Sequence, residues 1–347
     1  MKRGIEDGAF PGGVALVSLK GKVQYQGAFG HSMTAPEKRL MAMDSIFDMA
    51  SVTKAVATTT AAMQLIEEGR ITLADTVSDQ FNEYDWKNGN TTATIEDLMA
   101  HTSGFAAVYP FQETAKDPSD IVHLISTLHK SLQQMYEPGT NEIYSDLDYI
   151  LLGKIIEKVT GKTLDTYCRE RIFEPLGMKD TCFNPDPKLE RRLVATEVYP
   201  DRVCLGTVHD EKAFFMKGVA GHAGLFSTAS DMKLFADAIL NRGVLNGKRV
   251  LAEASIREMT RRRRPKIDGT FGLGWQLNTG SYTGAFGDLL PVGSFGHTGF
   301  TGTMIWMDMP TKLCSILLTN RVHPSRENTK ILRFRRVFNN IVAASLL

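Results

Sequence analysis

Hydrophobic runs rich in β-branched and aromatic residues lie near both ends of the sequence and are interrupted by short turns. They cover residues 13–19 and 23–29 near the start, and residues 302–308 and 313–319 near the end. The turns between them contain Gly21 and Pro310, and two such runs joined by a turn are typical of a β-hairpin. The pattern therefore predicts antiparallel strands at both ends of the chain.

Between these ends the hydrophobic positions follow the period of a helix. They recur at steps of three and four from Leu147 to Val159, and Gly161 follows as a natural C-terminal stop. Thr94-Ile95-Glu96-Asp97 has the form of an N-terminal capping box with Asp in place of the usual Glu, and residues 118–132 form another helical stretch. We therefore predict that the middle of the chain is mainly helical.

This order of elements predicts an α/β (α+β) fold, in which an antiparallel sheet flanked by helices carries an inserted, mainly helical domain. We place the α/β domain at residues 1–70 and 215–347, and the helical domain at residues 71–214. A chain of 347 residues is long enough for two or three domains and for a sizeable core.

Composition excludes several classes of protein. Forty Lys and Arg residues against 39 Asp and Glu residues leave a formal charge of +1, which offers no field for a nucleic-acid backbone. No apolar run approaches the ~18 residues of a membrane helix, and no signal peptide is seen at the start. The four cysteines form no CxxC pair and are interpreted as thiols. We therefore expect no nucleic-acid partner and no membrane span. The expected location is cytoplasmic as the sequence stands, or periplasmic or extracellular if a leader was removed. The oligomeric state is left open.

Ser51 and Lys54 are the first candidates for catalytic chemistry. They precede a helix-compatible run from Ala55 to Glu68, so Lys54 is expected one helical turn from Ser51. A serine is a weak nucleophile until a base takes its proton, and a lysine acts as that base only if its pKa is lowered. Free N–H groups at the helix start can also stabilise an oxyanion. The pair can therefore be a nucleophile and its base.

A Ser-x-x-Lys tetrad also occurs by chance, and a serine at a helix start is ordinarily a cap. Ser230 and Lys233 have the same spacing before an amphipathic run, and we interpret Ser230 as a plain N-cap. Ser51 is distinguished by the motifs that follow it along the chain.

Two further motifs follow Ser51 in order. Tyr144-Ser145-Asp146 places a phenol and a carboxylate at the start of a predicted helix, and Gly296-His297-Thr298-Gly299 precedes a predicted strand, where small residues let a substrate lie along the strand edge. The ordered set resembles the serine β-lactamase and penicillin-binding protein superfamily, whose signature is S-x-x-K, then S/Y-x-N, then K-T-G. Four more segments are similar to its class C β-lactamase-like branch: residues 98–104, 174–181, 221–228 and 271–275.

The resemblance covers nearly the whole chain. The branch includes class C β-lactamases, D,D-carboxypeptidases, D-aminopeptidases, family VIII-type esterases and cell-wall amidases, and residues 218–228 are most similar to the amidases. The resemblance implies a β-lactamase/transpeptidase-like fold with its active site in the cleft between an α/β domain and a helical domain.

The resemblance also implies roles for individual residues. Ser51 would be the acylated nucleophile, Lys54 its base, and Tyr144 the proton relay that later activates water. For this, the pKa of the Tyr144 phenol must fall from its ordinary value near ~10 under the influence of a cation. The backbone N–H groups of Ser51 and Phe300 would form the oxyanion hole, and Thr298 would help to orient the substrate.

Two positions depart from the superfamily pattern. Asp146 stands where Asn is usual, and a carboxylate there could hold Lys54 charged and weaken it as a base. His297, in the substrate-binding triplet that Gly299 completes, stands where Lys is common. An imidazole with the ordinary pKa near ~6.5 is mostly neutral at pH 7 and becomes cationic as the pH falls. Because a firm cation for a substrate carboxylate is missing, a strong β-lactamase is not the first choice.

Other signals have weaker interpretations. Three histidines lack the spacing of a metal site and are interpreted as hydrogen-bonding loop residues: His101, His209 and His222. We therefore predict no metal and no cofactor. The basic run at residues 261–266 is interpreted as a solvated loop or helix end. Trp275 and residues 105–111 either line an acyl pocket or pack in the core.

The sequence thus predicts a serine hydrolase that forms an acyl-enzyme on Ser51 and hydrolyses an amide or ester. The first choice of substrate is a cell-wall-derived peptide or amide, met as a small molecule or a peptidoglycan fragment; the alternative is a family VIII-type carboxylesterase. A further alternative is a non-catalytic penicillin-binding-like sensor, which Asp146 and His297 make conceivable. A pure binder, however, has no need of Lys54 and Tyr144 beside the serine.

Overall fold

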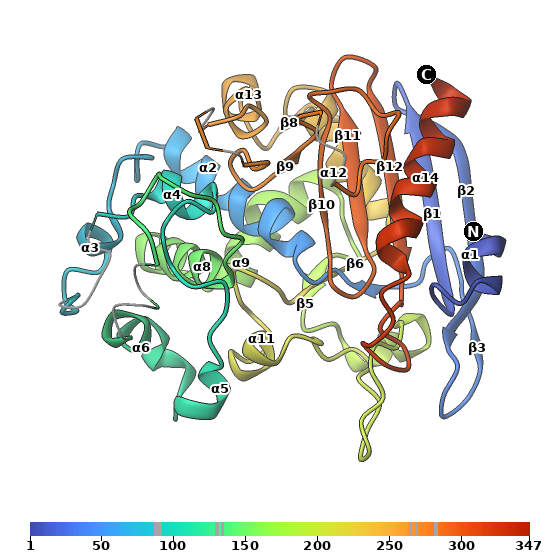
Figure 1. The fold of residues 1–347 in the computed structure, drawn as a ribbon, viewed down its shortest axis with the longest axis horizontal. Coiled ribbons are helices and arrows are strands. Elements are labelled where there is room, and N and C mark those ends of the chain that lie inside the picture. Colours follow the sequence, from blue (N-terminus) through green and yellow to red (C-terminus); the bar gives the residue numbers. More distant parts are fainter. Residues whose placement is uncertain (87–91, 129–131, 133–134, 264–265, 268, 281–283) are drawn as a thin grey trace.

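The computed structural model describes residues 1–86, 92–128, 132, 135–263, 266–267, 269–280 and 284–347. Its largest sheet has seven strands, and each strand is antiparallel to its neighbours (Figure 1). In order across the sheet they are β3 (Arg39–Leu40), β2 (Lys22–Met33), β1 (Gly12–Leu19), β12 (Leu313–Thr319), β11 (Met304–Asp308), β10 (Phe295–Thr298) and β9 (Gln276–Leu277). The predicted antiparallel sheet, built from both ends of the chain, is confirmed.

Both predicted hairpins form. The turn between β1 and β2 contains Lys20 and Gly21, whose φ angles of 52° and 77° are those of the tight turns that match the twist of paired strands. The second turn joins β11 to β12. β2 continues to Met33, beyond the predicted end at residue 29.

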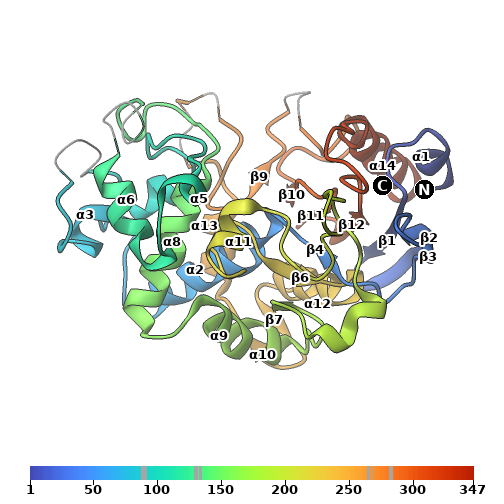
Figure 2. The ribbon, with the colours of Figure 1, turned by 90° about the horizontal axis from the view of Figure 1, so that it is seen from below.

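Both faces of the central strands are buried, because alternate residues of a strand point to opposite sides of the sheet. Leu16 of β1 joins a large core that includes α12 (Ala229–Leu240), whereas Val17 joins a smaller core that includes α14 (Ile331–Leu346). Figure 2 shows α12 and α14 on opposite sides of the sheet. This double coverage explains why β1 is hydrophobic at consecutive positions rather than at every second one.

Helices from the middle of the chain gather beside the β9–β10 end of the sheet (Figure 1). They include α2 (Thr60–Glu67), α3 (Val77–Gln80), α4 (Ile95–Met99), α5 (Phe111–Thr114), α6 (Ile121–Thr127), α8 (Asp146–Thr160) and α9 (Leu164–Cys168). The shorter helices elsewhere are α1 (Lys2–Glu6), α10 (Glu174–Leu176), α11 (Glu211–Phe215) and α13 (Glu253–Met259). Residues Lys54–Thr59 and Arg169–Phe173 are π-helical, and Pro118–Asp120 and Pro187–Arg192 form 3₁₀ turns.

Two small sheets complete the fold. One has the order β4 (Phe47–Asp48), β6 (Leu225–Ser227), β5 (Cys182–Phe183), and the other pairs β7 (Val244–Leu245) with β8 (Lys248–Arg249). β5 belongs to the segment that we predict as the helical domain, yet it pairs with β6 outside that segment. The domain limits at residues 70 and 214 stay a prediction.

The predicted signals for helix starts and stops agree with the structure in two cases. α8 is capped by the Ser145 side chain, which accepts a hydrogen bond from the Asp148 N–H, and it ends at Gly161 with a φ of 69°. Thr94 and Asp97 form the reciprocal bonds of a capping box at the start of α4. Both predictions are confirmed.

Two helix predictions need correction. The stretch predicted as a helix over residues 118–132 contains a 3₁₀ turn followed by α6, which ends at Thr127; residues 129–131 lie outside the described residues. Ser230 is not the N-cap of α12. Thr228 is the cap and accepts a hydrogen bond from the Asp231 N–H at 3.2 Å, because Thr228 with an acid three residues later makes the better capping arrangement.

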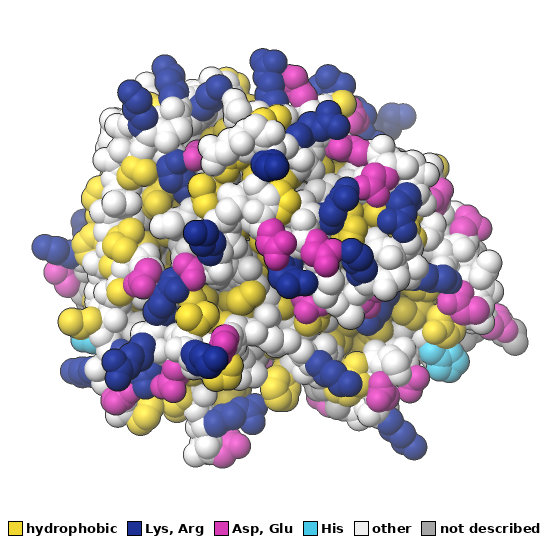
Figure 3. Space-filling view, turned by 180° about the vertical axis from the view of Figure 1, so that it is seen from behind, with side chains coloured by type: hydrophobic (Ala, Val, Ile, Leu, Met, Phe, Trp, Pro, Cys, Tyr) yellow, Lys and Arg dark blue, Asp and Glu magenta, His cyan; other side chains and the backbone are white. Residues whose placement is uncertain are grey.

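The surface has a mixed character. On the face seen in Figure 3, basic and acidic side chains are interspersed, in agreement with the formal charge of +1. None of the described helices is long and apolar enough to cross a membrane. All four cysteines are unpaired, as predicted.

Candidate active site

Ser51 lies at the start of the π-helical turn that leads into α2. The chain reaches it through Ala50, which has a φ of 46° and whose N–H donates to the Asp48 side chain at 2.8 Å. Met49 is fixed from the other side by a backbone hydrogen bond to Leu225 of β6. A left-handed conformation at a residue other than glycine is costly, so the surrounding bonds are what hold Ser51 in this position.

Lys54 is fully buried, and its ammonium group has three partners. Nζ donates to Ser51 Oγ at 3.1 Å, to Asp146 Oδ1 at 2.8 Å and to the carbonyl oxygen of His222 at 3.0 Å. Burial favours the neutral amine, but Asp146 and Tyr144 outweigh it, and the pKa of Lys54 is raised above its ordinary value. Lys54 is therefore a charged hydrogen-bond donor to Ser51 in the resting structure, as the replacement of Asn by Asp suggested.

Tyr144 lies beside this pair. Lys54 Nζ is 4.8 Å from the centre of the Tyr144 ring, and the ring packs against His101 with centroids 4.6 Å apart. Although Tyr144 as a whole is 37% exposed, desolvation of its inward-facing hydroxyl raises the pKa of that group more than its interactions with Lys54 and Ser51 lower it. The net lowering that a proton relay needs is therefore not found in the resting structure, which corrects the expectation for this residue.

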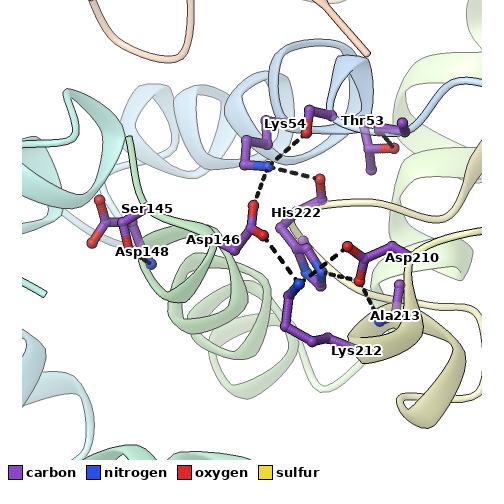
Figure 4. A network of polar contacts seen from close by, with 12 residues as sticks. Thr53, Lys54, Ser145, Asp146, Asp148, Asp210, Lys212, Ala213 and His222 are labelled. Carbon is purple, nitrogen blue, oxygen red and sulfur yellow. Dashed lines mark hydrogen bonds and ion pairs between the residues drawn. The ribbon is translucent and has the colours of Figure 1, made fainter. Parts of the chain in front are cut away.

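Asp146 belongs to a closed ring of polar contacts (Figure 4). Its Oδ2 lies 3.3 Å from the ammonium of Lys212, which also lies 3.2 Å from Asp210. Asp210 in turn lies 2.8 Å from the Nε2 atom of His222, whose carbonyl oxygen accepts from Lys54. Although burial disfavours its charge, the cations lower the pKa of Asp146 to about 2, and Asp146 is ionised between two lysines.

Lys212 and Asp210 were not indicated by any sequence motif. Asp210 could have been noticed as the N-cap of α11, where it accepts a hydrogen bond from the Ala213 N–H at 2.9 Å. Nothing in the spacing connects α11 with Lys54, because the contact depends on how α8 and α11 face each other in the folded protein. His222 was interpreted as a hydrogen-bonding loop residue, and the structure agrees.

Among the residues that the structure describes, one group of side chains has ligand atoms close enough to hold a metal ion. Asp146, Asp210 and His222 each place such an atom within 4.8 Å of the others. The ammonium of Lys212 already contacts both carboxylates, and that of Lys54 contacts Asp146. Because the negative charges are balanced by these lysines, we assign no metal to the group.

The turn after β10 lies directly against the residues before Ser51. Thr301 Oγ1 donates to the Asp48 carbonyl at 2.7 Å, and Thr303 Oγ1 donates to the Met49 carbonyl at 3.0 Å. A Cβ atom at Gly299 would come within 2.4 Å of the Met49 carbonyl oxygen, so only glycine permits this approach. The turn thus brings the backbone of Phe300 to the Ser51 side of the site.

The backbone N–H groups predicted to form the oxyanion hole are open. Among the hydrogen bonds of the described residues, none uses the N–H of Ser51 or of Phe300. The Gly299 carbonyl, which shares a peptide plane with the Phe300 N–H, accepts from Arg335 at 2.6 Å, and this bond fixes the direction of that N–H. Two unoccupied donors near a nucleophile are suited to stabilise a developing oxyanion.

His297 lies in β10, and its Nδ1 is 2.9 Å from the carbonyl oxygen of the half-buried Thr298. The His297 side chain is buried, and burial together with the nearby Lys54 lowers its pKa to about 3. His297 therefore stays neutral throughout the range from weakly acidic to neutral pH. This result corrects the expectation that it becomes cationic just below pH 7.

The remaining sequence candidates have structural roles. His101 contacts Asp148 at 3.1 Å, and His209 contacts Glu197 at 2.9 Å. Trp275 is completely buried in the large core, as are Phe105 and Phe111, so these aromatic residues are core residues. In the basic run, Arg261 and Arg263 pair with Glu258 of α13, whereas Arg264 and Pro265 lie outside the described residues.

Comparisons with known proteins agree with the geometry. The family model described as Beta-lactamase matches residues 1–339. A protein of Escherichia coli O157:H7 named "Putative D-alanyl-D-alanine carboxypeptidase" is 34% identical over 352 residues, which cover 91% of this chain and 80% of that protein.

Solved structures show the same fold. A penicillin-binding protein homologue from Caulobacter crescentus superposes with a TM-score of 0.76 at 21% identity, covering 100% of this chain and 95% of the other. EstCE1, a hydrolase with promiscuous acyltransferase activity, superposes with a TM-score of 0.75 at 20% identity, covering 96% of each chain. The family match over almost the whole length and the relative at 34% identity establish that the chain belongs to the β-lactamase family.

Proposed function

We propose that the protein is a serine hydrolase that forms an acyl-enzyme on Ser51 and acts on a cell-wall-derived peptide or amide. The observation that carries the proposal is the hydrogen bond from Lys54 Nζ to Ser51 Oγ at 3.1 Å, in a site where the N–H groups of Ser51 and Phe300 are unoccupied. A nucleophile with an adjacent proton-transfer group, together with free N–H donors, supports acyl transfer.

The reaction follows from the protonation states. Lys54 and Tyr144 both hold their protons at rest, so the reactive form is the one in which this pair has lost one proton. Ser51 Oγ then bonds to the acyl carbon while its proton passes to the pair, and the leaving nitrogen or oxygen departs with a proton from the pair. Water attacks the acyl-enzyme by the same proton path in reverse. Acylation should therefore become faster as the pH rises.

The relatives support a peptide substrate. The protein from Escherichia coli carries a name that refers to D-alanyl-D-alanine carboxypeptidase activity, and its match covers most of both chains. A peptide ending in D-alanyl-D-alanine is therefore the first substrate to test.

A second candidate, a carboxylesterase, is favoured by the charges near His297. His297 is neutral, and two arginines that contact the turn after β10 are already engaged: Arg321 donates to the Phe300 carbonyl and Arg335 to the Gly299 carbonyl. A substrate carboxylate would find no free cation among these groups. The Phe300 side chain is 51% exposed and offers an apolar contact instead.

Parallel turnover measurements separate these candidates. A nitrophenyl ester, nitrocefin, a D-alanyl-D-alanine peptide and a muramyl-peptide amide would be compared with wild type, Ser51→Ala and, as a matched control, Ser230→Ala. Turnover that is lost only in Ser51→Ala supports the hydrolase, and the substrate with the highest kcat/KM distinguishes peptidase from esterase. Binding without turnover in wild type would contradict the proposal and favour the sensor alternative.

A further inference from the structure

Lys212 occupies a position in the site for which the reaction described above gives no role. It lies at the N-terminus of α11, and its side chain is only 14% exposed. Its ammonium reaches across to α8 and lies 3.3 Å from Asp146 Oδ2, while Asp146 Oδ1 accepts from Lys54 at 2.8 Å. One carboxylate is thus shared by two lysines, of which Lys54 also donates to Ser51 Oγ.

A second carboxylate, that of Asp210, also holds the Lys212 ammonium. Asp210 caps α11 through the Ala213 N–H and lies 3.2 Å from the Lys212 ammonium. The same carboxylate lies 2.8 Å from His222, whose carbonyl oxygen accepts from Lys54. Because the ring of contacts is closed, Lys212 cannot leave Asp146 without disturbing several bonds (Figure 4).

The geometry points to Lys212 as a positioning residue that limits how firmly Asp146 holds the Lys54 proton; this assignment rests on the proposed function of Ser51. With Lys212 present, Asp146 shares its negative charge, and Lys212 also repels the Lys54 ammonium. Without Lys212, the whole charge of Asp146 would act on Lys54, and release of the proton would be harder. A carboxylate next to the base is compatible with catalysis only because a second cation accompanies it.

Other ionisable groups also face Lys54 and would contribute to any pH dependence. They are Tyr144 and Asp148 from α8 and the loop before it, His101 after α4, His297 of β10, and His222 and Asp210 on the α11 side. The proposal predicts that loss of the Lys212 cation moves the midpoint of the pH dependence to higher pH. The direction is the same whether Lys54 or Tyr144 takes the Ser51 proton, because both groups become harder to deprotonate.

The experiment measures how fast a fluorophosphonate labels Ser51 as a function of pH. In Lys212→Met, the midpoint of the rise in labelling rate should move to higher pH by about one unit, with roughly tenfold slower labelling at neutral pH. In Asp146→Asn the midpoint should move to lower pH, and Lys212→Arg should restore the wild-type midpoint. Lys233→Met is the matched control, because Lys233 is also a half-buried partner of an aspartate, Asp237, and lies outside the site.

The outcomes separate this inference from the proposed function. No labelling of Ser51 in the wild-type protein overturns both. Normal labelling with an unchanged midpoint in a folded Lys212→Met variant overturns the role of Lys212 alone, as does an equal shift in Lys233→Met. If Lys212→Met does not fold, Asp146→Asn decides: a midpoint that fails to move to lower pH overturns the inference.

Discussion

Thr303 Oγ1 donates a hydrogen bond to the carbonyl of Met49 at 3.0 Å and thereby joins the turn after β10 to the residues just before Ser51. The two N–H groups proposed as oxyanion donors, those of Ser51 and Phe300, belong to these two segments, one to each. The distance between these two N–H groups therefore depends on the hydrogen bond between Thr303 and Met49, in which neither N–H takes part. The same turn is held from behind by Arg335 of α14, which donates to the Gly299 and Thr303 carbonyls.

Replacing Thr303 with Val should lower kcat about tenfold, because a small displacement of one oxyanion donor weakens transition-state binding. KM should change little, since the donors act mainly on the developing charge. Steady-state kinetics on a nitrophenyl ester measure both quantities. Thr196→Val is the matched control, because Thr196 is also buried and donates to a backbone carbonyl, that of Cys204, at 3.1 Å. Equal losses in the two variants would contradict a specific role of Thr303.

A slow penicillin or a fluorophosphonate should add its mass to the peptide that contains Ser51, because only an activated serine acylates readily. Ser230 has the same spacing to a lysine, but it lies inside α12, where Lys233 pairs with Asp237. Ser51, in contrast, accepts a hydrogen bond from Lys54. Peptide mapping by mass spectrometry measures the adduct. An adduct on Ser230 would refute the assignment of the nucleophile.

Lys54→Ala and Tyr144→Phe should each lower kcat by several orders of magnitude, and the double variant should lose little more, because both residues serve one proton transfer. The hydrogen bonding of the Tyr144 hydroxyl with Lys54 and Ser51, which Tyr144→Phe removes while keeping the ring, is the structural basis for this coupling. A double-mutant cycle on kcat measures it. Fully additive losses would mean that the two residues act independently, and a loss of tenfold or less in Tyr144→Phe would remove that residue from the mechanism.

His297 should show no change of charge between about pH 5.5 and 8, because its pKa is lowered from 6.5 to about 3 and the imidazole becomes protonated only far below this range. The ratio of kcat/KM for a neutral and an anionic substrate should therefore stay constant with pH in the wild-type protein. His297→Lys should shift the ratio toward the anionic substrate. A ratio that changes near pH 6.5 in the wild-type protein would show that the imidazole titrates at its ordinary pKa.

The sequence allowed much of the fold and the candidate nucleophile to be predicted, because those features depend on local patterns. The hairpins follow from runs and turns, the end of α8 from Gly161, and Ser51 from the order of motifs along the chain. The electrostatic features of the site could not be predicted in the same way. The low pKa of His297 results from burial, which no single motif reveals, and the contact of Lys212 with Asp146 results from the packing of α11 against the start of α8.

The pairing of β1 with β12 has a consequence for how the enzyme is made. Val14 lies opposite Leu318, so the central part of the sheet cannot close until residues 313–319 have left the ribosome. The turn that carries Phe300 belongs to the same late segment, whereas Ser51 is synthesised early. A nascent chain therefore exposes the serine without the proposed Phe300 donor, and acylating activity should arise only after residues 313–319 have been synthesised and paired.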